Sequence, residues 1–138
     1  MKRPQRRRAR VLALQALYQL DSGRDREDVS SFLGEPEDPT GELARSLTHC
    51  VWQARTQLDD VLQRHLHDWS VARLGLVERA VLRLALYELL HQPEVPVAVV
   101  INEAVALAKR FASKEAGGLV NAVLDHAKAL RNESPETG

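Results

Sequence analysis

The chain has 138 residues, of which 44% are hydrophobic and 28% charged, a composition typical of one soluble globular domain. No apolar run is long enough to span a membrane, and the basic N-terminus lacks the apolar region of an export signal, so we expect a cytoplasmic protein. The single cysteine, Cys50, excludes an internal disulfide. We expect one domain over residues 1–131 and a disordered tail over residues 132–138.

The net charge of zero hides a strong asymmetry. Six of the 19 basic residues lie within the first ten positions, which hold no acid, so the rest of the chain has 13 basic and 19 acidic residues and is net negative. A basic N-terminal segment on an otherwise acidic chain predicts one surface that binds a polyanion.

Pro4 suits the first turn of a helix that we expect to run to about Asp21. Its apolar stripe has helical spacing: Ala9, Leu12, Ala13, Ala16, Leu17 and Leu20. A second strip of the helical wheel holds Arg3, Arg7 and Arg10 and continues through Leu14 and Tyr18, while Arg8 and Gln15 form a parallel line. The spacing predicts a solvent face of cationic and stacking groups.

Guanidinium groups match phosphate oxygens, and a tyrosine ring offers a flat surface to an unstacked base. This combination favours single-stranded RNA over a duplex groove as the ligand. If four or five arginines contact phosphates, affinity falls with salt with a log–log slope of about −3. The alternative is a charged, frayed terminus that only aids solubility.

The charged run 24–28 is expected to end the first helix. A short amphipathic piece from Val29 to Leu33 and a loop marked by Gly34, Pro36, Pro39 and Gly41 follow. Thr40 is expected to cap one long helix that ends near Leu66. Its apolar seam has a seven-residue rhythm and includes Cys50, which makes Cys50 a core residue rather than a nucleophile.

A metal site is not expected at His65, His67 and Asp68, because residues two apart on a helix do not face one ion. Neighbouring Trp69 is expected to fill a gap between helices or to form part of an interface.

The helix expected from Val77 to Leu90 is apolar around most of its circumference, so it must be surrounded by neighbours. Arg79 and Arg83 are expected to form its polar stripe, and Glu88 to be a buried polar tie between helices, with a catalytic role as the sharper alternative. Two further helices are expected, one starting at Pro96 or Val97 and one capped by Ser113. Lys109, Arg110 and Lys114 form a second basic patch between them. No convincing strand appears, so the fold class is all-α with about seven helices.

Five strings, in this order, resemble the NusB family of bacterial transcription antitermination factors. They are RRRAR at 6–10, QALY at 15–18, VERAVLRLALYEL at 77–89, INEAVALAKRF at 101–111 and VNAVLD at 120–125. The resemblance covers nearly the whole chain. It implies two packed three-helix sub-bundles and binding to boxA-type RNA of ribosomal leader transcripts. It also implies partnership with NusE, a small-subunit ribosomal protein, and entry into an RNA polymerase complex with other Nus factors.

By matching position, the resemblance implies an RNA-binding surface that also takes in residues of the last helix: Arg6, Arg7, Arg8, Arg10, Gln15, Tyr18 and Glu115. Glu78 matches a position on the NusE-facing side. Gly117, Gly118 and Leu119 stand where the family has a basic residue and then a phenylalanine that adds to RNA contact, which predicts weaker RNA contact there. Homodimerisation is left open.

Two alternatives to an RNA-binding adaptor without cofactor or metal stay open. One is a module that only binds a protein partner. The other is a stand-alone relative of the NusB-like domain that precedes some ribosomal RNA cytosine methyltransferases. No glycine-rich cofactor loop follows a strand and no nucleophile or metal-binding motif appears, so the sequence gives no indication of an enzyme.

Overall fold

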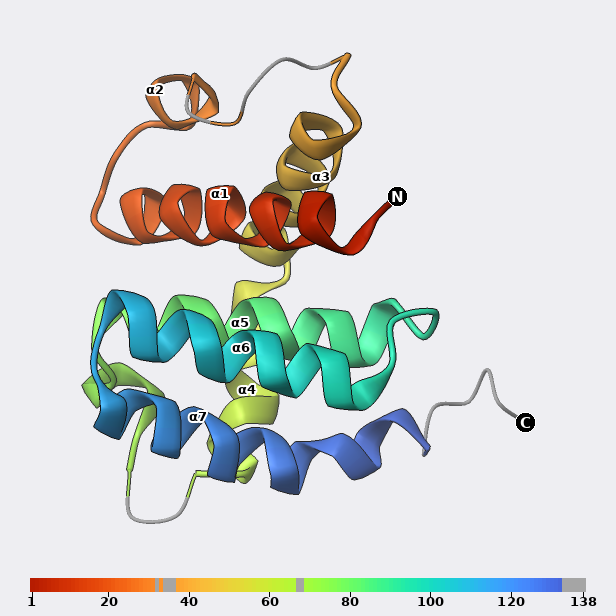
Figure 1. Ribbon diagram of the computed structural model, residues 1–138. Helices are drawn as coiled ribbons and strands as arrows, with labels where there is room; N and C mark the ends of the chain where they lie inside the picture. The colour runs from red at the N-terminus through yellow and green to blue at the C-terminus, as the bar shows by residue number, and fades with distance from the viewer. Residues whose placement is uncertain (32, 34–36, 67–68, 133–138) are drawn as a thin grey trace. The chain divides into compact units, whose positions relative to one another are not determined.

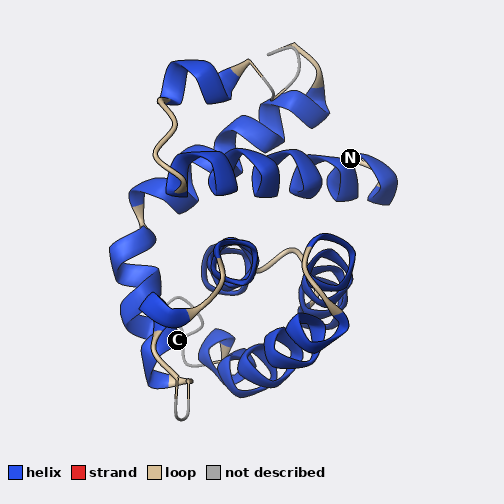
Figure 2. Cartoon of the chain, turned by 90° about the vertical axis from the view of Figure 1, so that its left-hand side faces the viewer, coloured by secondary structure: helices blue, strands red, loops and turns tan. Residues whose placement is uncertain are grey.

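The computed structural model describes residues 1–31, 33, 37–66 and 69–132. Within these ranges the chain forms seven α-helices and two short 3-10 helices and no strand, which confirms the all-α prediction (Figure 2). The chain divides into two compact units, with the boundary between Ala54 and Arg55. No helix in the described part is both long and apolar enough to cross a membrane.

The first unit contains α1 (Arg3–Asp21), α2 (Arg26–Ser30) and α3 (Pro39–Gln53). Helix α1 packs mainly against α3, and α2 lies over α1 (Figure 1). Small residues on α1 and α3 allow this close approach, while larger side chains fill the space beneath α2. The resulting core cluster consists of Ala9, Ala16, Leu20, Val29, Leu33 and Ala44, with Leu12, Leu43 and Trp52 packed at its edge.

Helix starts in this unit follow from side-chain caps. Asp25 accepts a hydrogen bond from the backbone N–H of Glu27 at 2.9 Å and caps α2, so the charged run 24–28, expected only to end the first helix, also begins the next one. Asp38, not Thr40, caps α3: its carboxylate accepts from the N–H of Thr40 at 3.2 Å. Pro39 then occupies the first turn, where its missing N–H and fixed φ are no disadvantage.

The single long helix expected from Thr40 to Leu66 is wrong, because it is interrupted at Ala54. That residue has φ −89° and ψ 5°, and its N–H still bonds to the carbonyl of Cys50 at 3.1 Å. Helix α4 (Arg55–Arg64) starts immediately afterwards. A one-residue turn leaves the spacing of apolar residues almost unchanged, so the sequence pattern could not reveal that the two halves belong to different units.

The second unit contains α4, the 3-10 turn η1 (Val71–Arg73), α5 (Leu76–His91), α6 (Val97–Phe111), α7 (Lys114–Ala127) and the 3-10 turn η2 (Lys128–Arg131). The starts of α6 and α7 are as predicted from the sequence. Helix α6 packs against both α5 and α7, and α4 packs against α5. Figure 1 shows α5, α6 and α7 aligned lengthwise with α4 crossing behind them. The second unit thus holds four α-helices rather than the three of the first.

Helix α5 is the predicted central helix, and it is buried on most sides. Glu88 is buried at 2% exposure, as expected. The expected polar stripe is wrong for Arg83, which is only 6% exposed. Its guanidinium donates two hydrogen bonds of 2.7 Å to the two carboxylate oxygens of Asp59 on α4. The two hydrogen bonds to the Asp59 carboxylate compensate for burying the guanidinium. A helical wheel marks Arg83 as polar but cannot show that it has such a partner.

The end of the described chain is fastened to α5 by one side chain, Arg131. Its guanidinium donates to four backbone carbonyls at the C-terminal end of α5 and in the turn that follows: Glu88, Leu89, Gln92 and Val95. The carbonyls of Glu88 and Gln92 also accept from the backbone N–H groups of Gln92 and Val95, both at 3.0 Å. Arg131 therefore adds hydrogen bonds to this turn and places positive charge at the negative end of α5.

Several expectations fall on residues outside the described ranges. They concern Gly34 and Pro36 in the first loop, His67 and Asp68 in the doubtful metal set, and the tail beyond Asn132. Trp69 is described and is 52% exposed, so it does not fill a gap in the core. The expectation of a single domain over residues 1–131 stays a prediction.

Candidate nucleic-acid interface

Helix α1 is fixed at both ends by local hydrogen bonds. At the start, the N–H of Lys2 donates to the side-chain oxygen of Gln5 at 3.1 Å, and Pro4 lies in the first turn. At the end, the Ser22 hydroxyl donates to the carbonyl of Tyr18 at 2.8 Å. Gly23 follows with φ +98°, a conformation that glycine adopts without strain, and its N–H bonds to the carbonyl of Leu20 at 3.0 Å. Side chains on α1 are therefore carried by a well-capped helix.

Most of the predicted polar residues of α1 do reach solvent. Arg3, Arg7, Arg8 and Gln15 are exposed, and Tyr18 has 39% of its surface exposed. Arg7, Arg8, Gln15 and Tyr18 occupy one side of the helix, with successive spacings of one, seven and three residues. We call these four residues the α1 face. It combines two guanidinium groups, one amide and one aromatic ring, without an acidic residue among them.

Arg10 does not belong to this surface, which corrects the sequence expectation. It is 3% exposed, and Leu14, expected on the same strip, is 2% exposed. Arg6 is half-buried. The buried arc of α1 is wider than its six-residue apolar stripe. One side of the helix packs in the α1–α3 core cluster, and a second side, which includes Leu14, is buried too. A helix with two buried sides leaves room for only a narrow solvent face.

The second basic patch is exposed in the second unit. Lys109 and Arg110 lie in the last turn of α6, and Lys114 starts α7. The Arg110 guanidinium lies over the Phe111 ring, 4.7 Å from its centroid. A Cβ atom placed on Gly117 would come within 2.6 Å of Cγ of Lys109. The absence of a side chain at Gly117 thus lets the aliphatic part of Lys109 lie across α7.

Two predicted RNA contacts lie on α7. The Ser113 hydroxyl accepts from the N–H of Ala116 at 3.0 Å and caps this helix, as predicted, and Glu115 is exposed in its first turn. Leu119, one turn further on, is half-buried. The two residues share a side of α7 because they are four positions apart. Their contact with RNA stays a prediction.

Glu78, the predicted partner-binding residue, has a structural task in this fold. Its carboxylate oxygen Oε2 accepts from the N–H of Gly75 at 2.9 Å, one of the donors that the start of α5 leaves without a helical partner. The side chain is half-buried. Any role of Glu78 in binding a partner must therefore be separated from its role as a cap.

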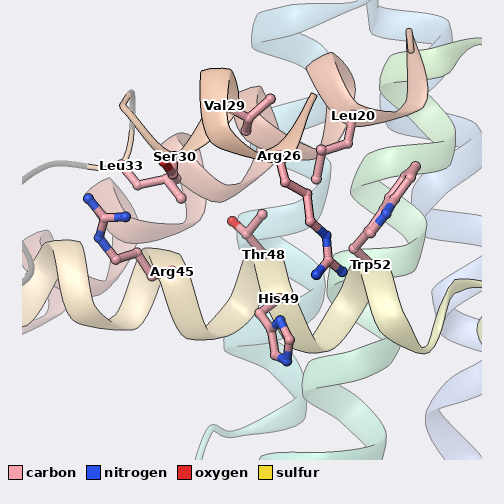
Figure 3. A pocket seen from close by; sticks show the side chains of 9 residues that line it. All are labelled: Leu20, Arg26, Val29, Ser30, Leu33, Arg45, Thr48, His49 and Trp52. Atoms are coloured by element: carbon pink, nitrogen blue, oxygen red, sulfur yellow. The ribbon is translucent and has the colours of Figure 1, made fainter. Parts of the chain in front are cut away.

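One feature escaped the sequence interpretation altogether. A pocket of about 200 Å³ opens in the first unit between α2 and α3, with a floor of Leu20, Val29 and Leu33 (Figure 3). Arg45, Thr48, His49 and Trp52 form its α3 wall. Their spacing of three, one and three positions places them on one helix side, a pattern that was available in the sequence.

The comparisons agree with the fold and with the sequence motifs. The model of the NusB family matches residues 7–129. The chain is 41% identical over 133 residues to the transcription antitermination protein NusB of Desulforapulum autotrophicum, covering 92% of this chain and 93% of that protein. It is 40% identical to NusB of Bacillus subtilis over 124 residues, 90% and 95% of the two chains.

Solved structures give the same result. NusB of T. maritima superposes with a TM-score of 0.82 at 35% identity, covering 96% of this chain and 99% of that one. A NusB chain solved as antitermination factors NusB and NusE in complex with double-stranded RNA superposes with a TM-score of 0.82 at 28% identity, covering 94% and 99%. The chain described here belongs to the NusB family.

Proposed function

We propose that this chain is a transcription antitermination factor that binds boxA-type RNA together with NusE and joins the RNA polymerase antitermination complex. The observation that carries the proposal is the α1 face, where exposed Arg7 and Arg8 lie on the same side of a capped helix as exposed Tyr18, about 15 Å further along its axis. Family membership and the likeness to a NusB chain solved with NusE and double-stranded RNA support RNA and NusE as partners. The preference for an unpaired strand is argued from the α1 face alone.

The residues of the α1 face suit the separate parts of a nucleotide. Guanidinium groups neutralise phosphates through paired hydrogen bonds, while the Tyr18 ring presents a surface on which an unpaired base can stack. The amide of Gln15 can both donate and accept at a base edge. Each stacked base contributes on the order of 1–3 kcal/mol. The exposed ring at Tyr18 favours unpaired RNA, because bases within a duplex do not offer their faces.

The partner proposal is a protein surface in the second unit. NusE is the partner in the related complex, and Glu78 is the residue we propose on the side that meets it. Glu78→Gln keeps an acceptor for the Gly75 N–H and removes only the charge. The substitution is therefore expected to weaken binding to NusE while leaving the melting temperature close to that of the wild type.

We further propose that the chain acts as an adaptor in the cytoplasm and catalyses no reaction. An adaptor needs a rigid surface for RNA and another for protein, and the two compact helical units can supply both. No specific observation favours the competing proposal of a module that binds only a protein. That proposal does not explain why the arginines and the Tyr18 ring of the α1 face are exposed together.

The test is the salt dependence of RNA binding. Fluorescence anisotropy with a labelled boxA-type single strand, with and without NusE, gives the affinity at several salt concentrations between about 50 and 200 mM. Three exposed arginines (Arg3, Arg7 and Arg8) predict a log–log slope of about −2. This is shallower than the −3 expected when Arg10 is counted, because Arg10 is buried.

The double variant Arg7→Gln/Arg8→Gln is expected to flatten the slope by about 1.4, since two phosphate contacts are lost. Arg24→Gln/Arg73→Gln is the matched control, with two exposed arginines changed outside the α1 face. Equal losses in both double variants would show that net charge alone drives binding. Tight binding of the same strand annealed to its complement would contradict recognition of unpaired bases.

A further inference from the structure

The pocket between α2 and α3 combines an apolar floor with positively charged side chains around it. Its floor is apolar, formed by Leu20, Val29 and Leu33, and the indole of Trp52 closes one end. Two guanidinium groups, Arg26 and Arg45, and the His49 imidazole surround it. In the view of Figure 3, Arg45 stands toward Leu33 and Arg26 toward Trp52, so positive charge lies at both ends of the apolar floor.

The hydroxyl groups in the wall have partners within the protein. The Thr48 hydroxyl donates to the carbonyl of Ala44 at 2.7 Å, and the Ser30 hydroxyl donates to the carbonyl of Glu27 at 2.9 Å. Their protons are therefore not available to a ligand. No acidic residue is among the described residues that line the pocket. A ligand there meets apolar surface at the centre and positive charge at the rim.

The size of the pocket limits what it can hold. Sites for cofactors and drug-sized molecules measure about 300–1,000 Å³, so a space of about 200 Å³ suits a single large side chain better than a whole ligand. Peptide-binding grooves use such spaces to hold one anchoring side chain, while charges around them select the sequence that flanks the anchor.

We propose that this pocket binds an acidic peptide segment of a protein partner, with one phenylalanine or leucine side chain on the apolar floor and flanking carboxylates on Arg26 and Arg45. A flipped RNA base is the other anion to consider. It fits less well, because reading a base edge requires donors and acceptors that the apolar floor does not offer. This inference concerns the first unit alone and does not depend on the proposed RNA contact of the α1 face.

The probe is an acetylated decapeptide with one phenylalanine flanked on each side by two glutamates and spaced by serines. The readout is the indole N–H resonance of Trp52 in the full-length ¹⁵N-labelled protein. Saturable movement of this resonance is expected, and a peptide with serine in place of phenylalanine is expected to bind at least about tenfold more weakly, because it has lost its anchor.

Two variants and one control separate charge from shape. Arg26→Glu reverses one rim charge, and the expected loss of affinity is at least about tenfold. Arg24→Glu makes the same change two positions away at an exposed residue outside the lining, and affinity is expected to stay within about twofold. Ser30→Trp fills the pocket without changing charge and is expected to abolish binding; circular dichroism checks that each variant is folded.

Three results would overturn the proposal. One is a Trp52 resonance that the phenylalanine peptide does not move. The second is an equal loss of affinity in Arg24→Glu and Arg26→Glu, which would show unspecific attraction of a negative peptide. The third is saturation of the Trp52 resonance by a single-stranded oligouridylate with no effect of the peptide, which would assign the pocket to RNA.

Discussion

The pair formed by Asp59 on α4 and Arg83 on α5 predicts an unequal response to removing either partner. The side chain of Arg83 is 7% exposed and that of Asp59 is 26% exposed, and two hydrogen bonds of 2.7 Å join them. Asp59→Ala takes the doubly hydrogen-bonded carboxylate away from a guanidinium in the core, and breaking a buried pair in this way costs about 3–5 kcal/mol. Arg83→Met leaves a carboxylate that water can still reach, so we expect a loss of about 1–2 kcal/mol.

Urea denaturation followed by circular dichroism at 222 nm measures both losses. The double variant Asp59→Leu/Arg83→Met removes both charges and is expected to lie within about 1.5 kcal/mol of the wild type, because apolar replacements of buried pairs are often nearly neutral. The reasoning is refuted if Arg83→Met is as destabilising as Asp59→Ala. It is refuted equally if the double variant loses as much as the sum of the two single changes.

Other predictions concern the second unit. Arg131→Ala removes a guanidinium that donates to four carbonyls, and a loss of about 2–4 kcal/mol of unfolding free energy is expected by urea titration, with Arg131→Lys recovering only part of it. Gly118→Ala, with nothing within 4 Å of the new Cβ, is expected to raise the free energy of unfolding by up to about 1 kcal/mol, measured by urea titration. Gly117→Ala, whose Cβ meets Lys109, should lack this gain. Lys128 donates a hydrogen bond to Asp125 and attracts its negative charge, which lowers the pKa of that carboxyl below 3.8. Carboxyl NMR titration of Lys128→Ala should show the pKa rising toward its ordinary value. Because the pKa is lowered on folding, the contribution of this pair is present above the unfolded pKa and fades as the pH falls through the folded one.

The helical periodicity predicted most of the fold correctly. The first, central and last two helices have apolar stripes and boundary residues that local physics explains, such as Pro4 at the start of α1 and Ser113 at the cap of α7. The interruption at Ala54 was missed because one turn residue hardly disturbs a seven-residue rhythm. The choice between Asp38 and Thr40 as the cap depended on backbone geometry rather than on composition.

The candidate site was predicted only in part, for a different reason. A helical wheel shows which residues share a side of a helix, but not how much of the helix circumference the neighbouring helices cover. Arg10 and Arg83 are long, charged side chains that the fold buries, and neither burial can be read from periodicity. The pocket beside Trp52 depends on how α1, α2 and α3 are arranged in the folded first unit, which the sequence of each helix alone does not show.

The most direct test of the account is a map of where RNA touches the protein. A boxA-type single strand that carries 4-thiouridine is crosslinked to the full chain with NusE present, and the adducts are located by mass spectrometry. The account predicts adducts on Tyr18 and its α1 neighbours, and their loss in Arg7→Gln/Arg8→Gln. Adducts confined to other helices, with α1 unmodified, would contradict the central claim that the exposed face of α1 binds unpaired RNA.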